Sequence, residues 1–222
     1  MKTAEQRKQE SIAVLQSQNI PWIEHLPVIE TADEVRLRSA EEIARRAIAC
    51  LITIQLACDR QNQENAEESQ IFMTGLLDRY GVRQYLTEKE KAVFDGTADT
   101  QQLTNMIWKY EAYWTLIWAL GLVGELAFPA EICDCQKAIE VVSGCETFEE
   151  FISGCQLRPI DELLDLTDLI FRYNWACVDA RIHGRECPGG LNGEVVVERH
   201  WGLNWLVDLD GTNDWDHVST NT

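Results

Sequence analysis

Apolar residues recur along most of the chain with helical spacing, and the stretch 104–128 is apolar on nearly every side. Such a stretch is typical of a helix buried at the centre of a domain or of a membrane span. Its uninterrupted apolar run, residues 112–124, is shorter than the roughly 18 residues that a span needs. We therefore predict a buried, tryptophan-rich central helix here and no membrane association.

Helical periodicity and helix-start signals predict further helices on both sides of this stretch. Capping boxes, in which a hydroxyl residue and a Glu three positions later satisfy each other's backbone donors, occur at Ser39/Glu42, Thr87/Glu90 and Thr147/Glu150. The predicted ranges are 4–17, 39–58, 68–80, 87–96, 134–142, 148–154, 159–183 and 194–207. No segment shows the period-two alternation of a half-buried strand. We expect an all-α fold: a single globular domain of about eight to nine helices, with residues 1–35 as an N-terminal helix and loop packed on a domain that spans residues 36–222.

Composition narrows the possible partners and the compartment. The 222 residues include 37 Asp and Glu against 19 Lys and Arg, a formal net charge of −18. This charge repels phosphate backbones and argues against nucleic-acid binding. We expect an unknown protein or small-molecule partner, which would be basic if it is charged. The N-terminal residues lack the apolar segment of a secretory signal, and we expect a cytoplasmic protein.

The eight cysteines are expected to be buried thiols, because disulfides are rare in the cytoplasm. Cys133, Cys135, Cys145 and Cys155 resemble a metal-binding set, but their spacing lacks the paired two-residue gaps of common zinc modules. A second set, Cys177, His183 and Cys187, gives no stronger indication. We predict no metal and no cofactor.

A polar stripe is predicted on the helix 159–183. Its members recur every three or four residues and share one face: Asp161, Asp165, Asp168, Arg172, Trp175 and Asp179. The stripe is either a solvated face or a partly buried seam against the last predicted helix, with Glu198, Arg199 and Asn204 opposite. A buried seam would be either a divalent-cation site on Asp161, Asp165 and Asp168 or a structural ion network.

Glu111 is the unusual charge of the apolar central stretch, because a buried carboxylate is costly unless it is paired. It either meets an arginine, with Arg158, Arg172 and Arg199 as candidates, or lies at the base of an aromatic slot that holds a cationic ligand. The candidate polar site is Glu111, Asp165, Asp168, Arg172, Glu198, Arg199 and Asn204. Its candidate aromatic lining is Trp108, Trp114, Trp118, Trp175 and Trp205.

Two function classes remain open. No catalytic Ser/His/Asp order, phosphate-binding loop, dinucleotide fingerprint or HExxH motif occurs in the sequence. This favours a non-catalytic binding or regulatory domain. The alternative is a metal-assisted or acid/base hydrolase-like enzyme that uses the carboxylates of Glu111, Asp165 and Asp168.

Several segments together resemble a known family. They are LRSAEEIARRA (37–47), WKYEAYWTLIWALG (108–121), LRPIDELLDLTDLIFRYNWACVDAR (157–181), VVERHWGLNWL (196–206) and the tail WDHVSTNT (215–222). The sequence resembles the bacterial family catalogued as domain of unknown function 4272. The resemblance implies that the polar constellation is a family feature, and it implies no activity. His217 and Asn221 stand where the family pattern has acids, which argues against a metal role for the tail.

Overall fold

The computed structural model describes residues 2–63, 65–208 and 214–222, and these residues contain helices and no strand. The prediction of an all-α fold is confirmed. The chain forms two compact units, each assembled from separate stretches of sequence. The first unit contains Met1–Arg38, Glu125–Ile132 and Arg158–Thr222, and the second contains Ser39–Gly124 and Cys133–Leu157. The domain division predicted at residue 35 stays a prediction. None of the helices in the described ranges combines the length and hydropathy that crossing a bilayer requires.

The second unit is built around α2 (Ala40–Asn62), which is buried along most of its length from Ile43 to Ala57. The capping box of Ser39 and Glu42 starts this helix as predicted. The helices that pack on α2 are α3 (Ala66–Arg79), α4 (Glu88–Phe94), α5 (Thr100–Trp108), α6 (Tyr110–Ala119) and α8 (Phe148–Ser153). The short helix η1 (Arg83–Tyr85) also contacts α2, and α7 (Cys135–Ser143) packs on α6.

The predicted central helix over 104–128 is wrong as a single element. It is interrupted at Lys109, between α5 and α6, and α6 ends at Ala119. Gly121 then adopts a φ of +74°, and the N–H of Leu122 donates to the carbonyl of Ile117 over 2.9 Å, which is the pattern of a helix stop at glycine. A Cβ at Gly121 would also lie 2.7 Å from the carbonyl oxygen of Gln156. Apolar composition continued past the stop, so periodicity alone did not locate it.

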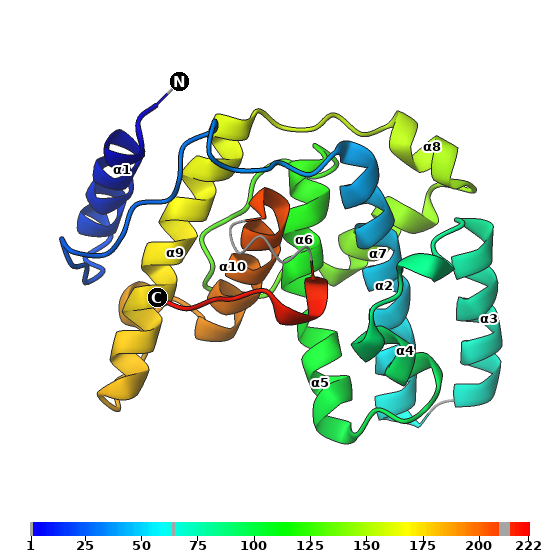
Figure 1. Cartoon of the computed structure of the whole chain (residues 1–222). Helices are drawn as coiled ribbons and strands as arrows, with labels where there is room; N and C mark the ends of the chain where they lie inside the picture. Colours follow the sequence, from blue (N-terminus) through cyan, green and yellow to red (C-terminus); the bar gives the residue numbers. More distant parts are fainter. Residues whose placement is uncertain (1, 64, 209–213) are drawn as a thin grey trace. The chain divides into compact units, whose positions relative to one another are not determined.

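The first unit is built around α9 (Ile160–Ile182). Both α1 (Ala4–Ser17) and α10 (Gly193–Val207) pack on α9 (Figure 1). The side chain of Asn192 caps α10 by accepting hydrogen bonds from the N–H groups of Glu194 and Val195. Two short helices, η2 (Pro188–Gly190) and η3 (Trp215–His217), lie before α10 and in the C-terminal segment.

Candidate functional site

The centre of the acidic stripe on α9 is an ion pair enclosed by protein. Both side chains, Asp168 and Arg172, are almost completely buried. The guanidinium donates two hydrogen bonds of 2.8 Å to the carboxylate and one of 3.2 Å to the carbonyl of Pro27. Because a buried carboxylate and a buried guanidinium each require compensation, this pair has a structural role and leaves Asp168 without a free charge for catalysis.

The N-terminal part of the stripe is covered by basic side chains of the N-terminal segment. The carboxylate of Asp165 accepts a hydrogen bond of 2.6 Å from Lys2 and one of 3.2 Å from Nε of Arg7. Arg7 is only 1% exposed, and its Nη2 lies 3.9 Å from Asp161. The set Asp161, Asp165 and Asp168, considered above as a cation site, is therefore already neutralised by side-chain cations.

The remaining predicted site residues fall into both units. Glu198 is half-buried, and Arg199 is buried and donates to the carbonyl of Ala127 over 2.6 Å. Glu111 belongs to the second unit, where its carboxylate accepts a hydrogen bond from the N–H of Cys133. The pairing of Glu111 with an arginine stays a prediction.

The predicted aromatic residues are likewise divided. Trp108, Trp114 and Trp118 lie on α5 and α6 of the second unit, whereas Trp175 and Trp205 lie on α9 and α10 of the first unit. Trp205 is buried beneath the guanidinium of Arg38, 4.0 Å from the ring centroid. This cation–π contact accounts for one predicted lining residue as part of the packing of its own unit.

The amide of Asn204 belongs to a buried polar cluster that also contains His200 and Asn174. The two amide nitrogens lie 3.1 Å from opposite nitrogens of the imidazole ring. They also donate to backbone carbonyls of the C-terminal tail, from Asn174 to Thr220 over 2.9 Å and from Asn204 to Ser219 over 2.8 Å. Burial lowers the pKa of His200 to about 3. The ring is therefore neutral at physiological pH, and the cluster fastens the tail to α9 and α10.

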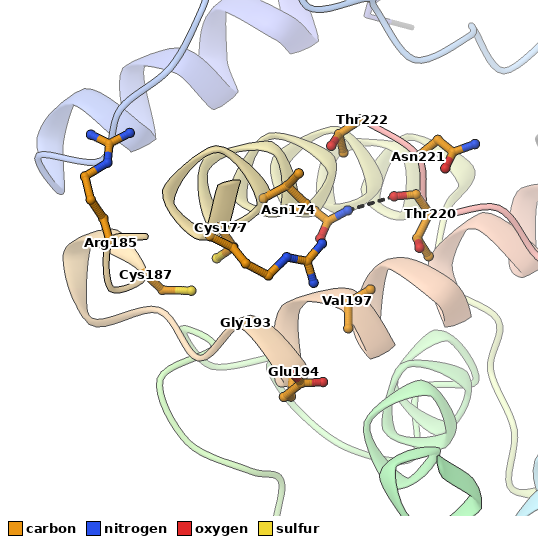
Figure 2. Close-up of a pocket in the computed structure, with 12 residues that line it drawn as sticks. Asn174, Cys177, Arg185, Cys187, Gly193, Glu194, Val197, Thr220, Asn221 and Thr222 are labelled. Atoms are coloured by element: carbon orange, nitrogen blue, oxygen red, sulfur yellow. Dashed lines mark hydrogen bonds between the residues drawn. The ribbon is translucent and has the colours of Figure 1, made fainter. Parts of the chain in front are cut away.

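Beside this cluster lies a cavity of about 660 Å³, here named the tail pocket. The residues that line it come from α9, α10, the loop between them and the tail (Figure 2). They are Asn174, Cys177, Val178, Arg181, Arg185, Cys187, Gly193, Glu194, Val197, Thr220, Asn221 and Thr222. The volume falls within the usual range for small-molecule sites.

The tail pocket combines a buried interior with a charged rim. Cys177 is buried, and Cys187 is half-buried. Their thiols lie within hydrogen-bonding reach, and burial followed by the contact with Cys187 raises the pKa of Cys177. Arg185 is bound to Asp179 over 2.6 Å, whereas Arg181 is exposed and forms no ion pair with another described residue. Arg181 is therefore the cation available to a ligand.

Most of this pocket was not predicted from the sequence. Cys177, His183 and Cys187 were considered only as a weak metal-binding set. The structure brings the two cysteines together, while His183 lies exposed beside Asp179. The helical spacing of Asn174, Cys177 and Arg181 places them on one face of α9 and was a usable signal. The contribution of Thr220 had no signal, because 46 residues separate it from Asn174.

No group of three or more His, Cys, Asp or Glu side chains is arranged to hold a metal ion in the described part of the chain. The first unit is an α-helical unit whose acidic stripe is paired with basic side chains and whose C-terminal tail lines part of a pocket. The chain belongs to the family described as domain of unknown function (DUF4272), whose model matches residues 7–218. Searches of curated proteins and of solved structures find no match.

Proposed function

We propose that this protein is a non-catalytic binding or regulatory domain of the cytoplasm, and that its ligand binds in the tail pocket. The observation that carries the proposal is the contrast within the first unit. The carboxylates of Asp165 and Asp168 are held in ion pairs, whereas the neighbouring tail pocket presents Arg181 without an ion-pair partner among the described residues. Nothing favours the hydrolase alternative.

The chemistry of the tail pocket supports a small molecule with an acidic group. The guanidinium of Arg181 would pair with a carboxylate or phosphate of the ligand, because arginine recognises both in a bidentate manner. The net charge of −18 supports a basic protein partner elsewhere on the surface, which would make the pocket a regulatory site for that interaction.

Thermal unfolding in the presence of a panel of small carboxylates and phosphate esters tests the proposal. A ligand at about 100 times its Kd stabilises the folded state by about 2.7 kcal/mol, which raises Tm by several degrees in a chain of this size. We expect this rise with at least one compound, and we expect Arg181→Met to abolish it.

The matched control is Arg79→Met, because Arg79 is an exposed arginine on α3 of the second unit. This variant should keep the full ligand-induced rise. The proposal would be contradicted if no compound of the panel raised the Tm of the wild type or of Arg79→Met, or if the rise persisted in Arg181→Met.

A further inference from the structure

Three cysteines from two separate segments lie close together in the second unit. Cys58 comes from α2, Cys133 from the segment before α7, and Cys135 is the first residue of α7. Cys133 and Cys135 are within hydrogen-bonding reach of each other. Burial is the main reason that the pKa of Cys58 is raised, followed by the charge of Asp59 and then by the charge of the nearby Cys135. All three are free thiols.

Cys135 occupies the position in this cluster that favours a reactive thiolate. It is half-buried at the N-terminus of α7, a nine-residue helix capped by Asp134, whose carboxylate accepts from the N–H of Lys137 over 2.9 Å. The partial positive charge of a helix N-terminus stabilises a thiolate. The thiol of Cys135 donates to the carbonyl of Cys133 over 3.6 Å. The contact with the thiol of Cys133 lowers the pKa of Cys135 to about 7, against the opposing effects of burial, Glu111 and Asp134.

The surroundings of Cys133 favour the protonated thiol instead. It is buried, and its backbone N–H donates to the carboxylate of Glu111, which is 1% exposed. The contact with Cys135, burial and the charge of Glu111 all raise the pKa of Cys133. A half-buried thiol with a lowered pKa therefore lies beside a buried thiol with a raised pKa, and a buried carboxylate lies next to the latter.

We propose that Cys133 and Cys135 form a redox-active dithiol that is oxidised reversibly by low-molecular-weight disulfides, with Glu111 as the base for Cys133. The juxtaposition that supports this is the CxC pair at the start of α7, backed by the Glu111 carboxylate of α6. This site belongs to the second unit and does not depend on the function proposed for the tail pocket.

The reaction balances with a disulfide RSSR as oxidant. The thiolate of Cys135 attacks one sulfur, a mixed disulfide forms, and one RS⁻ leaves. The thiol of Cys133 then transfers its proton to Glu111 and attacks Sγ of Cys135, which releases the second RS⁻. The two cysteines lose two electrons to form one S–S bond, and RSSR gains both. A disulfide across a single intervening residue closes a tight ring, and strained disulfides are the readily reduced, regulatory kind.

The first measurement is the rate at which iodoacetamide alkylates each cysteine of the full-length folded protein, followed by peptide mass spectrometry. At pH 7 a thiol with a pKa near 7 is about half ionised and one near 9 about 1% ionised, a gain that the lower nucleophilicity partly offsets. We expect Cys135 to react at least about fivefold faster than Cys145 and Cys155, whose pKa values burial raises. Equal rates would overturn the proposal.

The second measurement is oxidation by a series of oxidised-glutathione concentrations, with the remaining thiols then trapped by alkylation. In the wild type we expect a Cys133–Cys135 disulfide that dithiothreitol reverses. In Cys133→Ser we expect glutathione to accumulate on Cys135, and in Cys135→Ser we expect neither product. Cys155→Ser, the matched control, should behave as the wild type. A first disulfide between Cys135 and Cys58, or no disulfide, would overturn the assignment.

The role of Glu111 has a separate readout. The charge of Glu111 raises the pKa of both Cys133 and Cys135. In Glu111→Gln, the pH at which the alkylation rate of Cys135 is half-maximal should therefore be lower than in the wild type. It should also lengthen the life of the mixed disulfide, since Cys133 has lost its base. An unchanged pH profile in a variant that circular dichroism shows to be folded would overturn the role of Glu111. If this variant does not fold, the glutathione adduct in Cys133→Ser still decides the redox site.

Discussion

At the scale of single residues, the described part of the chain accommodates two buried titratable sites in different ways. Asp168 and Arg172 form an ion pair through two hydrogen bonds and have almost no contact with water. His200 has no acid among its hydrogen-bond partners, which are the amides of Asn174 and Asn204. A neutral imidazole has one donor and one acceptor nitrogen, so only the acceptor nitrogen can take a hydrogen bond from an amide NH2 group, and burial is what disfavours the charged ring.

The state of His200 predicts a dependence of stability on pH. Its pKa is about 3 in the folded protein and 6.5 in the reference state. Below pH 6.5 the unfolded chain therefore takes up a proton that the folded protein does not, and stability falls as the pH falls toward 3. The slope is at most about 1.4 kcal/mol per pH unit.

Urea unfolding between pH 7 and pH 5 measures this slope, in a range above the ordinary titration of most carboxylates. His200→Gln keeps polar groups at the site and removes the titration, so its free energy of unfolding should change less over this range than that of the wild type. The other histidines are common to both proteins and cancel in the comparison. Parallel pH profiles would show that His200 becomes protonated without unfolding.

At the scale of elements, the contact between α1 and α9 combines apolar packing with charge complementarity. Ile12 and Leu15 of α1 are buried, and the buried Arg7 meets Asp165 and donates to the carbonyl of Glu30 over 3.3 Å. The acidic stripe that looked like a solvated face or a cation site from the sequence is thus the docking surface for a helix of the same unit.

We expect Arg7→Met to lower the free energy of unfolding by about 1–3 kcal/mol, because the substitution removes a buried guanidinium that donates hydrogen bonds to a carboxylate and to a carbonyl. The matched control is Arg83→Met. Arg83 pairs with Asp78 over 2.6 Å, but both side chains are more than half exposed, and such pairs contribute about 0–1 kcal/mol. Equal losses in the two variants, measured by urea unfolding, would mean that Arg7 contributes no more than a surface ion pair.

At the scale of the whole molecule, the chain carries a large formal net negative charge of −18. Like charges repel in the compact state, and salt screens that repulsion. The internal ion pairs described above are partly protected from screening by burial, so repulsion between exposed acids should control the response to salt.

We therefore expect Tm to rise by about 2–4 °C, equivalent to about 1 kcal/mol, when NaCl increases from about 0.01 M to 0.15 M at neutral pH. The control is the same pair of measurements near the isoelectric point of about 4.5, where the net charge vanishes and the rise should disappear. A Tm that falls with salt at neutral pH would show that attractive surface pairs outweigh the repulsion.

The sequence by itself determined the features that depend on neighbours along the chain. The capping boxes at Ser39 and Thr87 begin helices where predicted, and Asp168 and Arg172, four positions apart on the predicted polar face, pair with each other. These interactions join residues three or four positions apart, so one helical turn decides them whatever the rest of the fold does.

Only the tertiary structure decided the features that join distant residues. It ended α6 at Ala119, paired Asp165 with Arg7 across 158 positions, and placed Thr220 over Asn174 beside the tail pocket. It also placed Glu111 beside Cys133, which explains a carboxylate that was only an anomaly in the sequence. Local periodicity identifies which face of a helix is polar, but not which segment covers that face, because the packing of the complete core makes that choice.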